Sequence, residues 1–189
     1  GLLPLKRQDK AALIGPMAES WYQDWYGGEP PCRKTIRDGL EALHVSCDSF
    51  DGWNRVQLMF GAKGVRVNED GSACLSDTPD VFAMEDWGEN DYTFRCVRTG
   101  TYLAMSMSPE EPGSRLNALR TMPFNWFVLE IFHLEATERG TLLLNCFHWP
   151  VEVQGEGFTF GKEYAGTPMR IEVVEDGVAR AASIAGKAD

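Results

Sequence analysis

The chain has 189 residues, of which 43% are hydrophobic, so it can bury a core in one domain or in two small ones. Acidic residues outnumber basic residues by 28 to 18, which argues against a nucleic-acid partner, because phosphate binding needs a concentrated positive surface. No apolar run approaches the roughly 20 residues that cross a bilayer, so we expect no membrane partner.

The cysteines and histidines do not have the spacing of a metal site. There are five cysteines, an odd number without a CxxC pair, and three scattered histidines. This usage favours reduced thiols, and with them a cytoplasmic location, over a disulfide framework. We expect no metal and no other cofactor. Because the chain begins at Gly1 without an initiator Met, we expect the native N-terminus and any signal to lie upstream, so the localisation stays unknown.

The first part of the chain is typical of the start of an α/β domain. Lys10 to Gly15 is a short apolar run that ends at Gly-Pro, as in a buried parallel strand. Thr35 stands three residues before Asp38, which predicts a capping box and a helix that begins there. His44 to Cys47 predicts a second strand, and the polar residues 48–53 predict a turn.

The end of the chain returns to this pattern. Residues 169–174 alternate as a strand, and Asp176 is placed to cap an alanine-rich helix. Such a helix is typical of a doubly wound sheet, and we expect the strand that it should precede to lie beyond Asp189. Residues 1–54 and 175–189 are therefore predicted to belong to one truncated α/β sandwich domain.

Residues 55–174 have the pattern of an all-β module, in which short apolar segments alternate with Gly, Asn, Asp and Pro turns. The pattern repeats weakly three times, with a period of about forty residues. Three repeats of this kind are typical of a β-trefoil. We therefore predict a mainly β chain with α/β flanks, in which a β-trefoil-like module is inserted into the α/β domain.

The second repeat resembles the fascin-like form of the trefoil, in which a Gly-x-Tyr-Leu turn precedes a Phe-x-Leu strand. The matching segments are Gly100 to Leu103 and Phe127 to Leu129. A PA14-like β-sandwich is the alternative interpretation of the insert. Modules of that kind run longer and do not have a threefold period.

Motifs in the two flanks occur in an order known from one enzyme family. In chain order they are Leu2-Leu3-Pro4-Leu5, Ala12-Leu13-Ile14-Gly15-Pro16, Ala18-Glu19-Ser20, the aromatic and glycine-rich segment 24–31, Thr35 to Leu40, and Asp176 to Asp189. In this order and spacing they resemble the second, α/β domain of glycoside hydrolase family 3, the β-glucosidase and β-xylosidase family.

The resemblance implies a retaining glycosidase that hydrolyses O-glycosyl bonds with two carboxylates. One carboxylate attacks the anomeric carbon; the other protonates the leaving oxygen and then activates water. In the family, the nucleophilic Asp lies in a barrel domain that precedes the Leu2 motif, and the acid/base Glu follows the segment that ends here at Asp189. We therefore expect no catalytic residue in this chain. Glu85-Asp86-Trp87 resembles the nucleophile motif, but inside the insert we interpret it as a solvated turn.

Aromatic residues after the first strand are the main candidates for contact with a sugar. Trp21, Asp24, Trp25 and Tyr26 follow the carboxyl end of that strand, where open α/β sheets place their ligands. Their rings could stack on a sugar, or they could pack the loop against a neighbouring domain. In the insert, Trp149 lies in a turn-like segment and is a further candidate.

Two hypotheses for the function follow. In the first, the chain is a non-catalytic part of a retaining β-glycosidase, and the insert binds a β-linked oligosaccharide or shapes the access of a glycoside to the barrel domain of the same protein. In the alternative, the insert is a protein-interaction or oligomerisation module without affinity for sugar. An apolar strand edge around Ala12 to Ile14 also predicts self-association into a homo-oligomer.

Insertion into a host domain requires the two ends of the module to be neighbours. We expect residues 51–55 to lie close to residues 171–174. We also expect the two flanks to pack against each other through Ile36, Leu40, Val178 and Ile184.

Overall fold

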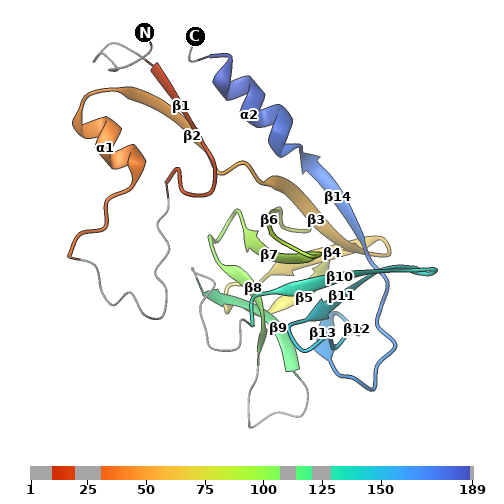
Figure 1. Cartoon of the computed structure of the whole chain (residues 1–189). Coiled ribbons are helices and arrows are strands. Elements are labelled where there is room, and N and C mark those ends of the chain that lie inside the picture. The colour runs from red at the N-terminus through yellow and green to blue at the C-terminus, as the bar shows by residue number, and fades with distance from the viewer. Residues whose placement is uncertain (1–9, 20–30, 107–113, 121–128, 188–189) are drawn as a thin grey trace. The chain divides into compact units, whose positions relative to one another are not determined.

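The computed structural model describes residues 10–19, 31–106, 114–120 and 129–187 and divides the chain into two compact units (Figure 1). Unit 1 combines Gly1–Trp53 with Asp176–Asp189, and unit 2 is Asn54–Glu175. The sequence predicted that the inserted module runs from residue 55 to residue 174, so each observed boundary differs from the predicted one by a single residue. Most of the secondary structure is β, as predicted.

In its described residues, unit 1 contains a two-stranded parallel sheet and two helices. Strands β1 (Lys10–Ile14) and β2 (Ser46–Phe50) pair in parallel over their full length, and helix α1 (Ile36–Ala42) connects them. Helix α2 (Gly177–Ala185) contacts both strands. The parallel pairing of the strand and the capping box at the start of α1 are confirmed. The expected burial of the strand is not, because its residues are half-buried or exposed.

Two expectations about unit 1 are wrong in detail. The second strand begins at Ser46 because His44 adopts a positive φ of 58° and donates its backbone N–H to the Glu41 carbonyl, which continues the turn after α1. Residues 46–50 are therefore strand, where a turn was expected from residue 48. Of the residues expected to join the two flanks, Ile184 is buried, but Ile36 and Val178 are 56% and 78% exposed.

Unit 2 forms a 12-stranded sheet within the described residues. Its strands are β3 (Asn54–Phe60), β4 (Lys63–Val67), β5 (Ala73–Ser76), β6 (Phe82–Gly88), β7 (Asp91–Cys96), β8 (Tyr102–Ser106), β9 (Ser114–Arg120), β10 (Phe132–Thr137), β11 (Gly140–Asn145), β12 (Val151–Gln154), β13 (Gly157–Phe160) and β14 (Arg170–Glu175).

Six of these strands form a closed ring. Antiparallel pairs join β3 to β6, β6 to β7, β7 to β10 and β10 to β11, and β14 pairs with β3. A bridge between Thr141 in β11 and Met169, next to β14, completes the circuit. The other six strands form three hairpins, β4–β5, β8–β9 and β12–β13.

The strand registers repeat three times around the ring. The first strand of each repeat carries a buried residue, and these residues are Leu58, Phe94 and Leu143. Two residues earlier, each strand pairs with the last strand of its own repeat; the three pairs are Val56 with Phe82, Tyr92 with Phe132, and Thr141 with Met169. Equal offsets at three places mean that the three repeats fold in the same way.

The interior of the ring is an apolar core. Phe82, Phe94 and Phe132 have no exposed surface, and the rings of Phe94 and Phe132 lie 6.2 Å apart. Burial of large aromatic side chains is a major source of stability in a domain of this size. Within the described residues, no helix is long and apolar enough to cross a membrane.

The two ends of unit 2 lie side by side, as insertion requires. Arg55 pairs with Glu175, and Val56 pairs with Val173, in the antiparallel ladder between β3 and β14. The expected proximity of the two ends is therefore confirmed. Because β14 closes the ring against β3, the chain leaves unit 2 beside the place where it begins.

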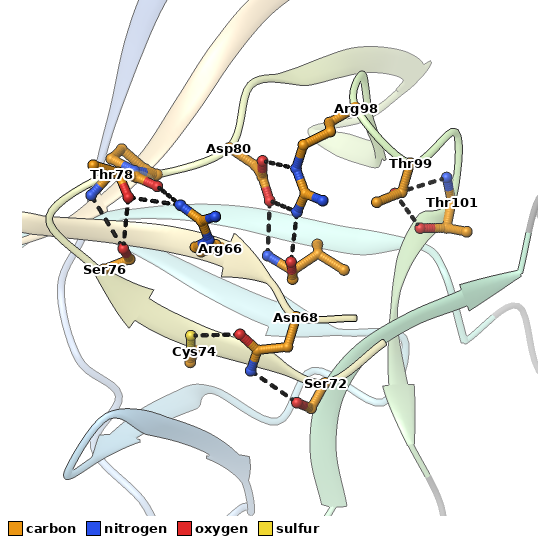
Figure 2. Close-up of polar contacts among 12 residues, drawn as sticks. Arg66, Asn68, Ser72, Cys74, Ser76, Thr78, Asp80, Arg98, Thr99 and Thr101 are labelled. Carbon is orange, nitrogen blue, oxygen red and sulfur yellow. Dashed lines mark hydrogen bonds and ion pairs between the residues drawn. The ribbon is translucent and has the colours of Figure 1, made fainter. Parts of the chain in front are cut away.

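An ion pair connects the first repeat to the second. Nε and Nη2 of Arg98, in the turn after β7, donate to Asp80 Oδ1 and Oδ2 at 2.8 and 2.7 Å, and Asp80 Oδ2 accepts from the Val67 N–H (Figure 2). Burial tends to raise the pKa of Asp80, but these donors outweigh it and hold the pKa below its usual value.

The interpretation of Glu85-Asp86-Trp87 as a turn is wrong, and of these three residues Glu85 is not solvated. These residues lie in β6, and the Glu85 carboxylate is buried. It accepts hydrogen bonds from Tyr102 Oη at 2.8 Å, Thr93 Oγ1 at 3.0 Å and Arg95 Nε at 3.2 Å. Glu85 shares a face of β6 with Ala83, opposite the core residue Phe82, and is covered there by Tyr102, Thr93 and Arg95. These donors compensate for its loss of water.

Candidate ligand-binding pocket

A pocket of about 600 Å³ lies among the three hairpins of unit 2. Each repeat contributes the second strand of its hairpin; the first and third also contribute the turn before that strand, and the second contributes Ser106 at the end of β8. The lining residues are Asn68, Asp70, Ser72, Ala73, Cys74, Ser106, Arg115, Leu116, Asn117, Leu119, Gln154, Glu156, Gly157, Phe158 and Thr159. Residues of all three hairpins thus bound the pocket.

Leu119 adds an exposed apolar side chain to the lining, and three buried side chains at equivalent positions form the apolar floor of the pocket. They are Ala73, Leu116 and Phe158. Each faces an equivalent residue on the first strand of its hairpin: Val67 pairs with Ala73, Met105 with Leu116, and Val153 with Phe158. The apolar floor is therefore fixed by the same registers that build the hairpins.

Backbone hydrogen bonds between neighbouring hairpins hold the pocket together. The Ala118 N–H donates to the Gly71 carbonyl at 2.7 Å, and the Leu75 N–H donates to the Glu156 carbonyl at 2.8 Å. Strands β9 and β13 pair at the third place, where Phe160 faces Ser114. Each hairpin thus meets the next at an equivalent point, which fixes the strands and turns that line the pocket relative to one another.

The side of the pocket formed by the turn between β4 and β5 has an ordered polar network. Ser72 Oγ donates to Asp70 Oδ1 at 2.6 Å. It accepts from Asn68 Nδ2 at 3.0 Å, and Cys74 Sγ donates to Asn68 Oδ1 at 3.4 Å (Figure 2). The hydrogen bonds from Ser72 to Asp70 lower the pKa of that carboxyl group. Asp70 is therefore a carboxylate at neutral pH.

The opposite side is formed by the turn between β12 and β13. Glu156 Oε1 forms an ion pair with Lys63 Nζ at 3.2 Å, and Gln154 Nε2 donates to the Tyr164 hydroxyl at 3.3 Å. Asn117 and Thr159 add an amide and a hydroxyl group to the lining. The pocket therefore offers amides, hydroxyls, carboxylates and the Arg115 guanidinium group above an apolar floor, a lining with many hydrogen-bond donors and acceptors.

Four of the five predicted sugar-contact residues, Trp21, Asp24, Trp25 and Tyr26, lie outside the described residues. The fifth, Trp149, follows β11 in the turn that leads to β12. Its N–H donates to Asn145 Oδ1 at 2.9 Å, and its ring lies 5.3 Å from that of Phe147. The side chain is half-buried against the core of unit 2 and does not line the pocket.

The sequence analysis did not identify the pocket residues. Their signal in the sequence is weak, because Asn, Asp, Ser and Gly in residues 68–72 are also the ordinary residues of a turn. Recognition requires alignment of the three repeats, which places residues 72–74, 115–117 and 157–159 at one level. Among the described residues, no group of His, Cys, Asp and Glu could hold a metal ion.

The fold places the chain among mainly β proteins, and no family model matches it. A malate dehydrogenase from Corynebacterium efficiens is 29% identical over 115 residues, which are 54% of this chain and 34% of that enzyme. The chain thus spans about a third of the length of this curated relative. At this identity and coverage the match does not assign the chain to a family.

Solved structures show the same fold at low sequence identity. A salivary protein of the cysteine- and tryptophan-rich family from Culex quinquefasciatus has a TM-score of 0.53 and 17% identity, over 65% of this chain and 94% of that chain. An endo-β-galactosidase from Clostridium perfringens that releases GlcNAcα1-4Gal has a TM-score of 0.51 and 12% identity, over 69% of this chain and 34% of that chain. These likenesses support the mainly β fold.

Proposed function

We propose that this chain is a non-catalytic part of a retaining β-glycosidase related to glycoside hydrolase family 3. Unit 2 is its inserted module, which binds glycan or shapes the access of a glycoside to the catalytic barrel domain. The observation that carries the proposal is the polar pocket of about 600 Å³ among the three hairpins, whose size is within the range of about 300–1,000 Å³ common for ligand sites.

The β-trefoil assignment of unit 2 belongs to this proposal. It is supported by a closed ring of six strands, three hairpins and three equal register offsets. A PA14-like sandwich, with two sheets packed face to face, is less consistent with a ring that closes through Thr141 and Met169. The fascin-like variant rests on the sequence of the second repeat alone.

The place of the chain in a glycosidase rests on the order of the flank motifs and on one structural parallel. The Clostridium perfringens endo-β-galactosidase, which acts on glycans, has a segment of similar fold over 34% of its length. A glycan-cleaving enzyme thus contains this fold together with other parts. The likeness is one of fold, and the glycan affinity of unit 2 is our proposal.

The chain by itself is expected to have no hydrolytic activity. Glu85 is buried and saturated with donors from Tyr102, Thr93 and Arg95, which suits a structural carboxylate better than a nucleophile. The purified chain should hydrolyse aryl β-glycosides no faster than buffer. Turnover that disappears in Glu85→Gln, while the variant stays folded, would contradict the proposal.

Binding of the full chain to a glycan array, followed by calorimetric titration with each glycan that binds, tests the proposed function. We expect affinity for at least one β-linked oligosaccharide. The alternative, a protein-interaction or oligomerisation module, predicts no glycan affinity, and sedimentation would then show self-association through exposed apolar residues such as Ile14 and Leu43. Absence of binding on the array would overturn glycan binding and leave this alternative.

A further inference from the structure

We infer that the pocket among the three hairpins binds a single neutral sugar residue, so that each chain holds one glycan end. We call it the axial pocket, because an axis that relates the three hairpins would pass through it. This inference rests on the proposed glycan binding and adds its site, stoichiometry and ligand class. It follows from the position of the pocket, from its asymmetric lining and from the charges on its rim.

The position of the pocket fixes the stoichiometry. Three equivalent strands meet around it, and each supplies one residue at the level of the floor: Ala73, Leu116 or Phe158. Pseudosymmetry would give three copies of a site located within one repeat. A site on the axis between the repeats exists once, because all three repeats share it.

The lining around that floor differs between the repeats. One residue before the floor, the repeats present Ser72, Arg115 and Gly157; one residue after it, they present Cys74, Asn117 and Thr159. The three walls therefore carry different donors and acceptors although their backbones are equivalent. Such a lining distinguishes the orientations of a ligand with hydroxyl groups around a ring, whereas a symmetric lining would not.

Gly157 provides space on one wall. Its φ is outside the left-handed region, and a Cβ atom there would come no closer than 3.7 Å to the Gln154 carbonyl oxygen. A larger side chain would therefore extend into the pocket without backbone strain. Gly157→Leu is a variant that fills the pocket while leaving the hairpin intact.

The charges of the rim favour a neutral ligand. Asp70 and Glu156 contribute two carboxylates, whereas Arg115 contributes one guanidinium group. Lys63 forms an ion pair with Glu156, so two negative and two positive formal charges balance at the rim. A uronic acid or a sulfated sugar would bring a further negative charge beside these carboxylates, and the chain as a whole carries a net charge of −10. Carboxylates and amides accept and donate the hydrogen bonds that neutral sugar hydroxyls offer.

Titration of the full chain with methyl β-glycosides and β-linked disaccharides of glucose, xylose, galactose and N-acetylglucosamine, and with glucuronic acid, tests the inference. We expect one binding site per chain and a preference of at least about tenfold, or 1.4 kcal/mol, for the best neutral sugar over glucuronic acid. Asn117→Ala and Gly157→Leu should each weaken binding by about tenfold or more. Glu138→Ala, at an exposed turn outside the pocket, is the matched control and should bind like wild type.

Alkylation of Cys74 gives an independent readout. Its thiol lines the pocket, so bound sugar should slow its reaction with iodoacetamide, measured peptide by peptide with mass spectrometry. The exposed Cys32 in unit 1 serves as the internal control and should react at an unchanged rate. Thermal melting of each variant shows whether a loss of binding comes from unfolding.

The outcomes separate this inference from the proposed function. If wild type binds sugar but the two pocket variants bind equally well and Cys74 is not protected, the axial site is wrong and glycan binding stands. Three equal sites per chain, or tighter binding of glucuronic acid, would also overturn the inference. If no glycan binds to wild type, the proposed function fails first.

Discussion

The two units of this chain differ in how completely they bury their apolar side chains. In unit 2 the ring closes on itself, and residues such as Leu58, Phe94 and Leu143 have no exposed surface. In unit 1 the two parallel strands and two helices leave Leu43 64% exposed and Val178 78% exposed. Short strands that close into a ring can surround a core, whereas two open strands cover only a small apolar surface.

The comparison indicates where the stability of each unit comes from. Parallel strands normally occur in sheets covered on both faces, and a two-stranded sheet is marginal in water. Unit 1 depends correspondingly more on its helix caps, Thr35 at α1 and Asp176 at α2. Unit 2 depends on its core and on the polar groups that join its repeats.

The largest expected effect is the loss of a core aromatic residue from unit 2. Phe94→Ala removes a fully buried ring that contacts the rings of Tyr92 and Phe132, and it should cost about 3–5 kcal/mol of unfolding free energy. Urea unfolding followed by near-ultraviolet circular dichroism measures this cost. A cost below 1 kcal/mol would mean that the ring does not enclose a packed core.

Removal of the ion pair between the first two repeats should have the next largest effect. Arg98→Ala leaves the buried Asp80 carboxylate without its cation and should cost about 2 kcal/mol near pH 7. Because the pKa of Asp80 is lower in the folded chain, its contribution is present above the unfolded value of about 3.9 and is lost as pH falls through the folded value.

Urea titrations of wild type and Arg98→Ala at pH 7 and at pH 3 test this dependence. The difference between the two proteins should be smaller at pH 3. An unchanged difference would show that Arg98 acts through packing and not through the charge of Asp80. Arg98→Lys, which keeps the charge but loses the two-point contact, should fall between the two proteins.

A smaller effect is expected at the cap of α2 in unit 1. Asp176 Oδ1 accepts from the Ala179 N–H at 2.8 Å, and Asp176→Ala should destabilise the helix by about 1 kcal/mol. Hydrogen exchange of residues 177–187 should become roughly fivefold faster, while exchange in β6 and β7 stays unchanged. Asp176→Asn, which keeps the capping oxygen, is the matched control. If Asp176→Ala accelerated hydrogen exchange equally in α2 and in β6 and β7, the two units would not unfold independently, contrary to this prediction.

The smallest expected effect is at Val178 in α2. Its side chain is exposed, and alanine is the better helix former, so Val178→Ala should stabilise the helix by about 0.5 kcal/mol or less. The same substitution at Val151, which is fully buried in unit 2, should instead cost about 2 kcal/mol. Thermal melting and hydrogen exchange of the two variants measure the effect of the same valine-to-alanine substitution at an exposed and at a buried position. A loss at Val178 as large as that at Val151 would show that this face of α2 is covered.

Local sequence signals predicted the features that depend on neighbouring residues. The capping box at Thr35 and Asp38, the apolar strand from Lys10 and the Asp176 cap arise from interactions within a few residues, and all are present. The mainly β character of residues 55–174 follows from alternation and turn residues and is also present. The β-trefoil assignment and the glycan-binding residues stay predictions.

Features that depend on distant residues were predicted poorly. Glu85 looked like a solvated charge, because nothing nearby in the sequence shows that Tyr102 and Arg95 lie within hydrogen-bonding distance of its side chain. Ile36 and Val178 looked like packing residues from helical spacing, yet spacing shows which side chains share a face and not whether another element covers that face.

The sequence by itself therefore determined the element types, the helix caps and the three repeats, because these follow from interactions between near neighbours along the chain. The proximity of the two ends of unit 2 was also predicted, from the requirement that an inserted module returns to its host. The tertiary structure alone decided the burial of Glu85 and the pocket between the hairpins. Ser72, Asn117 and Thr159 come from three different repeats and meet because strand registers across the ring bring them to one level. A register is fixed by packing of the whole sheet, so no single segment of sequence specifies it.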